Sequence, residues 1–306
     1  MFLLYYIIMI IESIPPIFQP NYISRYPSYS SGKNMEEIFY AYFLKEHTNI
    51  QTDLVYLPVF WTSYYVTNGY GERIEPLYDW LDKLDKNKKY FTIVQYASGI
   101  YIKNSIPNLI VYSAGGGGLN LKSDSVKIDN FYNLTRHIFY GNTADYTIPL
   151  ICLPSFPCIN IEKYIYCSFM GRFDTHKCRI EMKELLQNHD KFVFYNSVGY
   201  EEYKKILNTS IFTLAPRGYG YTSFRIYEAI LAESIPIYIW ENKKILPFED
   251  VLNWDEFSIV INANEIKNLP TLLEKCNISK MQAKLKEVKH YFSFQGTFDY
   301  IKQKIT

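Results

Sequence analysis

Short apolar runs and amphipathic stretches alternate through the second half of the chain. The apolar runs predict strands at Tyr164–Phe169, Phe192–Tyr195, Ile211–Leu214, Ile235–Trp240 and Phe257–Ile261. The amphipathic stretches have apolar residues at helical spacing, which predicts helices over Arg179–Leu186, Glu201–Asn208, Ser223–Ala232 and Asn264–Cys276. Strands that alternate with helices in this way form a parallel sheet that is covered on both faces.

The first half of the chain has a weaker pattern of the same kind. Its apolar runs predict strands at Leu54–Pro58, Phe91–Gln95, Leu109–Ser113 and Ile148–Leu153. Helices are expected over Met35–Lys45 and Ile74–Leu84, and again over Met281–Lys304 near the end of the chain. The pattern therefore predicts a second sheet of the α/β class.

The first eleven residues are apolar, but they are too short for a membrane-spanning helix of about 20 residues. No basic residue precedes them, as one would in a signal peptide. We expect them to form a buried first strand, and we expect the protein to lack a transmembrane segment.

Length and alternation together predict two domains, because 306 residues can hold two domains of about 150 each. We place an N-terminal Rossmann-like domain over residues 1–153 and a second domain over residues 154–285. Residues 286–306 would form a C-terminal helix that crosses back to the first domain. The segment Pro149–Pro157 contains three prolines and is the expected linker.

The segment Thr213–Trp240 combines a strand, a turn, the start of a helix and a second strand. Arg217–Gly220 has the composition of the turn, and Thr222 or Ser223 is the expected N-cap of the helix. The backbone N–H groups and the dipole at a helix N-terminus favour a bound phosphate. This segment is therefore a candidate anion site.

Two charged residues of the same helix support a nucleotide site. Arg225 and Glu228 are three residues apart, so they share one helix face. Arginine offers forked donors to phosphate oxygens, and a carboxylate can accept from the two hydroxyls of a ribose. An ordinary turn with a surface salt bridge is the alternative. The scarcity of arginine, seven of the 32 basic residues, favours the anion site.

Charge and cysteine content limit the function further. The formal net charge of +1 and the absence of a basic stripe argue against nucleic-acid binding. Five cysteines without a CxxC pair are typical of reduced thiols, which predicts a cytoplasmic protein. Thirty tyrosines reflect composition and do not by themselves identify a sugar site.

The sequence resembles the exostosin-like glycosyltransferases over about residues 160–275. The matching residues are Phe169–Arg172, Arg179, Leu214–Gly220, Thr222–Arg225, Tyr227–Ala229, Ile235–Ile237, Pro247–Phe248, Val251–Leu252, Trp254 and Phe257–Ser258. In the first half the match is limited to Asp53–Pro58 and Phe60–Ser63. Eukaryotic members of this family usually carry a membrane anchor and work in the Golgi lumen, so the expected absence of an anchor favours a soluble enzyme.

The resemblance implies the GT-B architecture, in which two Rossmann-like domains face each other across a cleft. It also implies an inverting enzyme that moves a sugar from a UDP- or GDP-sugar to a hydroxyl of a glycan or glycoprotein, with the acceptor on the side of the first domain. The donor-binding residues would be Arg172, Tyr195, Arg217, Gly218, Tyr219, Gly220, Thr222, Ser223, Arg225 and Glu228.

The chain contains no Asp-x-Asp pair, which is the sequence that holds a divalent cation in the metal-dependent architecture. We therefore expect no metal requirement and no permanently bound cofactor. The charge of the departing diphosphate would be stabilised by arginines and by the helix N-terminus.

The catalytic base should be a carboxylate or a histidine of the first domain. Asp145 and His137 are the main candidates, and Glu72 and Asp53 are weaker ones. The glycines Gly115–Gly118 could cradle a phosphate, but a flexible loop is the favoured interpretation because the lysine of a P-loop is missing. A catalytically inactive binding protein and a nucleotide-sugar epimerase or hydrolase stay open as alternatives.

Overall fold

The computed structural model describes residues 8–24, 27–121, 125–129, 135–139, 144–154 and 156–306, and for residues 125–129 and 135–139 the backbone alone. The chain divides into two compact units. The first unit contains residues up to Ile128, Thr135–Ile148 and Phe294–Thr306, and the second contains Asp129–Leu134 and Pro149–Ser293. Each unit is described by itself below.

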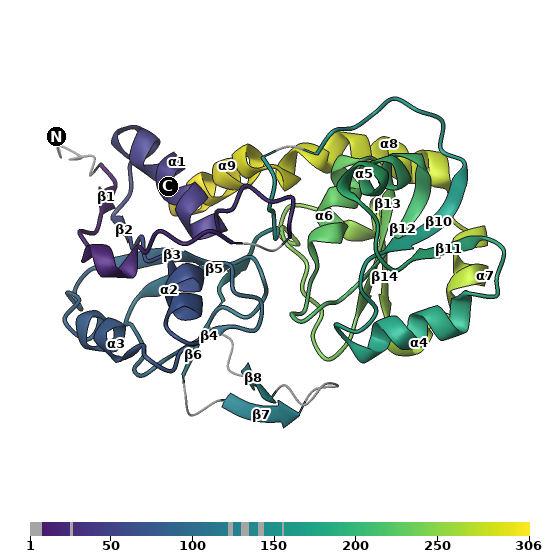
Figure 1. The fold of residues 1–306 in the computed structure, drawn as a ribbon. Coiled ribbons are helices and arrows are strands. Elements are labelled where there is room, and N and C mark those ends of the chain that lie inside the picture. Colours follow the sequence, from purple (N-terminus) through teal and green to yellow (C-terminus); the bar gives the residue numbers. More distant parts are fainter. Residues whose placement is uncertain (1–7, 25–26, 122–124, 130–134, 140–143, 155) are drawn as a thin grey trace. The chain divides into compact units, whose positions relative to one another are not determined.

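The first unit is built on a five-stranded parallel sheet (Figure 1). Its strands, in spatial order, are β1 (Ile10–Ile11), β2 (Leu54–Tyr56), β3 (Lys89–Val94), β5 (Leu109–Ser113) and β9 (Tyr146–Thr147). The helices are α1 (Met35–Glu46), α2 (Trp61–Thr67), α3 (Glu75–Leu81) and α9 (Phe294–Ile305). The spatial order of the strands is thus their order in the sequence.

Two small sheets and two 3₁₀ helices complete the elements before the second unit. The strands β4 (Ile100–Ile102) and β6 (Leu119–Leu121) pair in parallel, and β7 (Ser125–Asp129) pairs with β8 (Thr135–Phe139). The 3₁₀ helices are η1 (Pro16–Phe18) and η2 (His47–Asn49).

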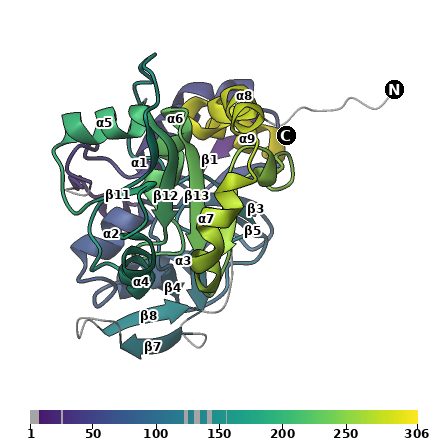
Figure 2. The same ribbon diagram turned by 90° about the vertical axis from the view of Figure 1, so that its right-hand side faces the viewer.

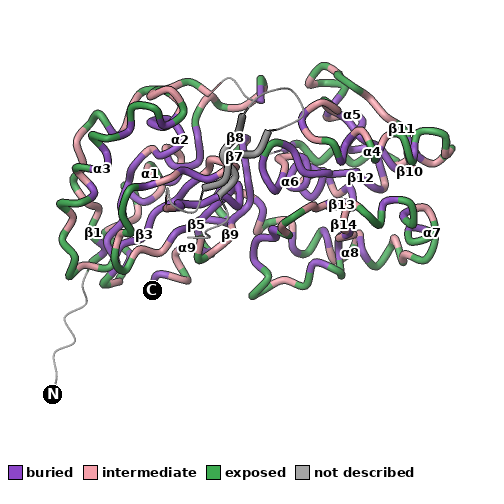
Figure 3. Tube along the Cα trace, turned by 90° about the horizontal axis from the view of Figure 1, so that it is seen from below, coloured by how far each residue is buried: buried purple, intermediate pink, exposed green. Residues whose placement is uncertain are grey.

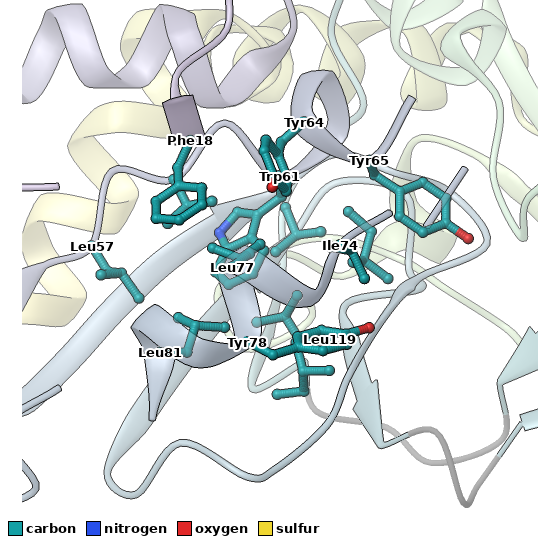
Figure 4. Close-up of a cluster of buried hydrophobic side chains, with 14 of the residues drawn as sticks. Phe18, Leu57, Trp61, Tyr64, Tyr65, Ile74, Leu77, Tyr78, Leu81 and Leu119 are labelled. Atoms are coloured by element: carbon teal, nitrogen blue, oxygen red, sulfur yellow. The ribbon is translucent and has the colours of Figure 1, made fainter. Parts of the chain in front are cut away.

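The core of the first unit is rich in aromatic side chains (Figure 4). Trp61 is 1% exposed, and its indole N–H donates to Thr92 Oγ1 at 2.8 Å. Thr92 Oγ1 in turn donates to the carbonyl of Leu57 at 2.8 Å. Because the indole N–H of Trp61 and the hydroxyl of Thr92 both have a partner, Trp61 of α2 can pack on the sheet without the cost of an unpaired donor.

The second unit also has a five-stranded parallel sheet. Its strands, in spatial order, are β11 (Phe192–Tyr195), β10 (Ile165–Met170), β12 (Ser210–Pro216), β13 (Ile235–Trp240) and β14 (Ile259–Asn262). The helices are α4 (Lys177–Leu186), α5 (Tyr200–Thr209), α6 (Phe224–Leu231), α7 (Leu269–Glu274) and α8 (Ile278–Val288), with 3₁₀ helices η4 (Trp254–Glu256), η5 (Ala263–Asn268) and η6 (Lys289–Phe292).

The chain reverses direction once within this second sheet. It passes from β10 through α4 to β11, and then returns through α5 to β12 on the other side of β10. Helices α5 and α6 consequently lie on one face of the sheet and α4 on the other (Figures 1 and 2). A reversal of this kind is a topological switch point, and in open α/β sheets ligands bind at the carboxyl ends of the strands beside it.

The predicted fold class is confirmed: each unit is a Rossmann-like α/β unit with a parallel sheet. The strands of the second unit match their predicted ranges closely, and β11 and β13 match to the residue. The expected helix over Asn264–Cys276 is divided into η5 and α7, with Pro270 in the first turn of α7.

The predicted strand Ile148–Leu153 is wrong. The strand β9 ends at Thr147, and Pro149 lacks the N–H that a further ladder bond would need. Leu150 and Ile151 are 5% and 4% exposed, and the hydroxyl of Tyr227 in α6 bonds to the backbone of Leu150. The segment is apolar because it packs on a helix, which an apolar run alone cannot distinguish from a buried strand.

A first strand is present at the N-terminus, but the expectation that it is buried is wrong for the residues described. Residues 1–7 lie outside the described part, and β1 is a two-residue strand at the edge of its sheet. Ile8 and Ile10 are 52% and 49% exposed, whereas Met9 between them is buried. Within the described residues, no helix combines the length and the apolar character that crossing a membrane requires.

Candidate functional site

The switch point of the second unit lies between β10 and β12, and arginine side chains gather at the carboxyl ends of these strands. Gly171 follows β10 directly, and Arg217 follows β12. Gly171 has φ +134°, and a Cβ atom at this position would lie 2.3 Å from Nη2 of Arg225. Glycine is therefore needed here, because the guanidinium of Arg225 lies against the backbone of residue 171.

Arg225 is a buried cation with unmet hydrogen-bond donors. It lies in the first turn of α6, a largely buried helix (Figure 3), and is 8% exposed. Its guanidinium packs on the ring of Phe169, 4.7 Å from the ring centroid. Its Nε and Nη1 are buried and have no hydrogen-bond partner, and it forms no ion pair with any described residue. A buried arginine in this state is uncommon unless an anion completes it.

Arg217 is the second buried cation, with 3% of its surface exposed. Its backbone N–H donates to Ile239 O at 3.1 Å, and its Nη1 donates to the carbonyl of Glu241 at 3.1 Å. The guanidinium lies 4.9 Å from the centroid of the Tyr221 ring, and Nε is buried without a partner. These contacts hold the side chain of Arg217 in place, and its Nε has no hydrogen-bond partner among the described residues.

Arg179 is the residue whose role the sequence did not indicate. It is 5% exposed, and its guanidinium donates to three carbonyl oxygens: Arg217 at 2.8 Å, Arg172 at 2.9 Å and Pro216 at 3.2 Å. It therefore ties the end of β12 to the loop after β10. The only available signal was its match to the family pattern, because a buried arginine on α4 follows the same helical spacing as a core residue.

Arg172 contacts the buried arginines through its backbone carbonyl, which accepts from Nη1 of Arg179 at 2.9 Å. Its side chain is 63% exposed and forms a bidentate ion pair with Asp174, with Nε and Oδ1 2.9 Å apart. This pair lowers the pKa of Asp174. Tyr195 is half-buried at the end of β11, and its carbonyl accepts from the N–H of Gly171 at 3.0 Å. The donor-binding role of both side chains stays a prediction.

The turn and the helix cap lie where the motif predicted them. Gly218 and Gly220 are buried, and Tyr219 between them is 39% exposed. Ser223 is the N-cap of α6, and its Oγ accepts from the N–H of Arg225 at 3.4 Å. Thr222 is 3% exposed, and its Oγ1 lies 3.2 Å from the hydroxyl of Tyr227. Ser223 thus caps the helix, and the buried side chain of Thr222 contacts Tyr227 of the same helix.

Glu228 lies one helical turn after Arg225 and is 5% exposed. One carboxylate oxygen accepts from the hydroxyl of Tyr203, and the other accepts from the thiol of Cys152 at 3.5 Å. A surface salt bridge with Arg225, the alternative reading of this pair, is wrong, because both residues are buried and no ion pair joins them. The predicted contact with a ribose stays a prediction.

The candidate bases belong to the first unit. Asp145 is exposed, and its Oδ2 accepts from the N–H of Val111 at 2.8 Å. His137 lies in β8, and its side chain is outside the described residues. Asp53 pairs with Lys89 at 2.7 Å on the surface, and Glu72 is exposed. None of the four base candidates is assigned by these contacts.

Among the described residues, neither the glycine loop Gly115–Gly118 nor a cluster of metal-ligating side chains forms a second candidate binding site. Gly116 and Gly118 donate their N–H groups to Ser113 Oγ at 3.0 and 3.1 Å, and Gly115 packs on the backbone of Ala97. This loop is therefore packed on its own unit, in contrast to the flexible loop expected from its composition. No three His, Cys, Asp or Glu side chains of the described residues gather closely enough to hold a metal ion.

Comparison with known proteins identifies the same region of the chain. Residues 157–276 match the Exostosin GT47 domain. A probable glycosyltransferase of Arabidopsis thaliana is 30% identical over 159 residues, which cover 47% of this chain and 33% of that protein. Exostosin-1 of Bos taurus is 28% identical over 106 residues, or 33% of this chain and 14% of that protein. The chain spans a third or less of the length of these relatives.

Among solved structures, the pneumococcal O-GlcNAc transferase GtfA in complex with UDP and GlcNAc is similar at 12% identity and a TM-score of 0.40, over 87% of this chain and 59% of that one. This likeness is too distant to support a statement about the site. The sequence match is different, because it spans the strands and helices that hold Arg179, Arg217, Arg225 and Glu228. The predicted resemblance is therefore confirmed: residues 157–276 of this chain match the Exostosin GT47 domain.

Proposed function

We propose that the protein is a glycosyltransferase that binds a nucleoside-diphosphate sugar at the switch point of its second unit. The observation that carries this proposal is Arg225, whose buried guanidinium has two donors without a partner. Leaving a buried charge uncompensated costs several kcal/mol, so the site is suited to an anion. Arg217 supplies a second fixed cation, and the N-terminus of α6 adds partial positive charge.

The proposed reaction is an inverting transfer that needs no metal ion. The hydroxyl oxygen of the acceptor forms a bond to the anomeric carbon while the bond from that carbon to the diphosphate breaks. The electron pair leaves with the diphosphate, and a base takes the proton of the hydroxyl. In this proposal the buried guanidinium groups of Arg225 and Arg217 would stabilise the charge of the leaving group, which is an electrostatic contribution of several kcal/mol in comparable sites.

The remaining components are proposed from the family resemblance. The donor would be a UDP- or GDP-sugar and the acceptor a glycan or glycoprotein. The cytoplasm is proposed as the location from the cysteine content and not from the family. Asp145 and His137 stay the candidate bases. One carboxylate oxygen of Asp145 accepts from the N–H of Val111. The pH dependence of turnover in Asp145→Asn tests whether Asp145 is the base.

Isothermal titration of the full chain with UDP and with GDP tests the donor site. We expect one nucleotide to bind and Arg225→Ala to weaken that binding at least 100-fold. Arg73→Ala is the matched control, because Arg73 is an exposed arginine of the first unit, and it should bind as the wild type does. If neither nucleotide binds, or if Arg225→Ala binds normally, the proposal is wrong.

A second experiment distinguishes transfer from epimerisation, hydrolysis or binding without chemistry. Product analysis of the bound nucleotide sugar, with and without a glycan acceptor, should show a glycosylated product only when the acceptor is present. An altered or hydrolysed sugar in the absence of acceptor would indicate one of the other reactions on the same fold. An intact donor in every mixture, across a panel of acceptors, would indicate a binding protein.

A further inference from the structure

Three segments of the second unit meet at the buried carboxylate of Glu228. Glu228 lies in α6, Tyr203 lies in α5, and Cys152 lies in the irregular segment that packs on α6. Tyr203 is 7% exposed and Cys152 is 6% exposed, so both donors reach the carboxylate from inside the protein. The ring of Phe156 packs edge-on against Tyr203, with centroids 6.2 Å apart.

Both donors stay protonated throughout the physiological pH range. Burial raises the pKa of the Tyr203 hydroxyl and the pKa of the Cys152 thiol, and the nearby charge of Glu228 raises both further. A neutral hydroxyl and a neutral thiol can donate to the carboxylate but cannot neutralise it. They therefore fix the direction of the carboxylate without removing its ability to accept from a ligand.

The position of Glu228 relative to Arg225 indicates which part of a ligand it would meet. The two residues are three positions apart, so their side chains lie on one face of α6, about one helical turn or 5 Å apart. If Arg225 binds the diphosphate, then Glu228 lies next to the group attached to the phosphates. In a nucleoside diphosphate that group is the ribose, whose two hydroxyls are donors for a carboxylate.

We propose that Tyr203 and Cys152 are positioning residues that orient Glu228 toward the ribose hydroxyls, and that this arrangement makes the site selective for ribonucleotides over 2′-deoxyribonucleotides. The inference rests on the proposed donor site. A carboxylate has about four lone-pair directions, so one carboxylate can accept from protein donors and from ligand hydroxyls together. A carboxylate that rotates freely would lose this geometry and with it the selectivity.

The test compares the affinities for UDP and 2′-deoxy-UDP, or for GDP and 2′-deoxy-GDP if the protein prefers guanine. A hydrogen bond to a charged group contributes about 1.5–3 kcal/mol, so the wild type should prefer the ribonucleotide by about 10- to 100-fold. Tyr203→Phe should weaken the ribonucleotide several-fold and leave the deoxyribonucleotide almost unchanged. The ratio of the two dissociation constants should therefore move toward one.

A role limited to packing α5 on α6 gives a different result. Tyr203→Phe would then weaken both nucleotides equally, or neither, and the ratio would stay at the wild-type value, which would overturn the inference. Tyr164→Phe is the control, because Tyr164 is 65% exposed in the same unit. Cys152→Ser retains a donor and should keep the ratio, whereas Cys152→Ala should lower it.

The failure of this inference can be distinguished from the failure of the proposed function. A wild type that binds neither nucleotide contradicts the donor site itself. A wild type that binds UDP and 2′-deoxy-UDP equally well contradicts only the role of Glu228 at the ribose. Thermal unfolding of each variant verifies that a change in affinity is not caused by loss of the fold.

Discussion

The two units contain the same kind of sheet but differ in the order of their strands. In the first unit the order is β1-β2-β3-β5-β9, so the chain moves across the sheet in one direction. In the second unit the order is β11-β10-β12-β13-β14, and the chain reverses beside β10. Only the second sheet therefore has a topological switch point, and the buried arginines of the described residues lie there.

The two units also differ in how their buried polar groups are paired. In the first unit, Glu36 is 1% exposed, and one of its oxygens accepts from Thr62 N, Thr62 Oγ1 and Gln95 N. Asn34 donates to Ser63, and Ser63 donates to Glu37. These groups mainly form hydrogen bonds with one another, and the bonds join α1, α2 and the end of β3. In the second unit, Arg225 keeps two buried donors without a partner. Oε2 of Glu36 is also buried without a partner, but burial raises the pKa of this carboxyl, so the group can become neutral, whereas an arginine stays charged. The unpaired charge of Arg225 is therefore the group that is suited to a ligand.

Arg225→Ala should produce the largest effect. Loss of the buried guanidinium should reduce nucleotide binding or turnover at least 100-fold, because a donor aimed at developing charge contributes about 3 kcal/mol. The melting temperature of the free protein should stay the same or rise, because removal of an unpaired buried charge relieves a destabilising group. Calorimetry of the free and nucleotide-bound protein measures both. A lower melting temperature with normal binding would make Arg225 a structural residue like those of the first unit.

Gly171→Ala should have a smaller effect through the same guanidinium. The new Cβ would lie 2.3 Å from Arg225 Nη2, at a φ of +134° that side chains rarely adopt. We expect a loss of about 10-fold in nucleotide affinity and a destabilisation of about 1–3 kcal/mol. Gly199→Ala is the matched control, because nothing lies within 4 Å of a Cβ at that position. Equal affinities for the two variants would show that the approach of Arg225 to residue 171 is unimportant for binding.

The pH dependence of stability tests the first unit. Burial and, to a smaller extent, the charge of Glu36 raise the pKa of Glu37 to about 7, although Ser63, the backbone of Asn34 and the charge of Lys33 oppose the shift. The native protein therefore binds more protons than the unfolded chain between about pH 4.5 and 7, so stability should fall as pH rises through this range.

Glu37→Gln removes this proton linkage. At pH 8 it should stabilise the protein by about 1 kcal/mol, less than the full shift would give because the side chain is half-buried and partly screened. At pH 4.5 it should have little effect. Denaturant unfolding at both pH values is the measurement, with the exposed Glu75→Gln in the first turn of α3 as the control. A stability difference that is independent of pH would disprove the assigned shift.

Ser223→Ala should have the smallest effect. The side chain caps α6 through a long contact of 3.4 Å to the N–H of Arg225, so its loss should cost about 0.5–1 kcal/mol of unfolding free energy. Ser223→Asp retains a cap acceptor and should restore stability, but the added negative charge beside the anion site should weaken nucleotide binding. If Ser223→Asp has wild-type stability and also binds nucleotide as the wild type does, the N-cap of α6 is not part of the anion site.

Much of the second unit could be predicted from the sequence because its local signals agree. Apolar runs end where the strands end, and the residues from Arg217 to Ser223 have the composition of a turn and a cap. The contacts of Arg179 could not be predicted, since they depend on where three carbonyl oxygens meet in space. For the same reason, the exposure of Arg172 and its pairing with Asp174 did not follow from the motif.

The first half of the chain was less predictable because its apolar residues have several different roles. Leu150 and Ile151 are apolar and buried but pack on α6 instead of extending a sheet. Helix α2 was missed because its seven residues are almost continuously apolar or small and show no helical period. The polar network of Glu36, Ser63 and Gln95 joins residues up to 61 positions apart, and no local pattern predicts such pairs.

A crystal structure of the full chain with UDP or GDP, whichever binds in titration, is the most direct test of the difference between the units. We predict that the diphosphate lies within hydrogen-bond distance of Nε and Nη1 of Arg225, beside the loop that carries Arg217, and that the ribose contacts Glu228. A diphosphate bound at the carboxyl ends of the strands of the first unit, with Arg225 still without a partner, would contradict the account.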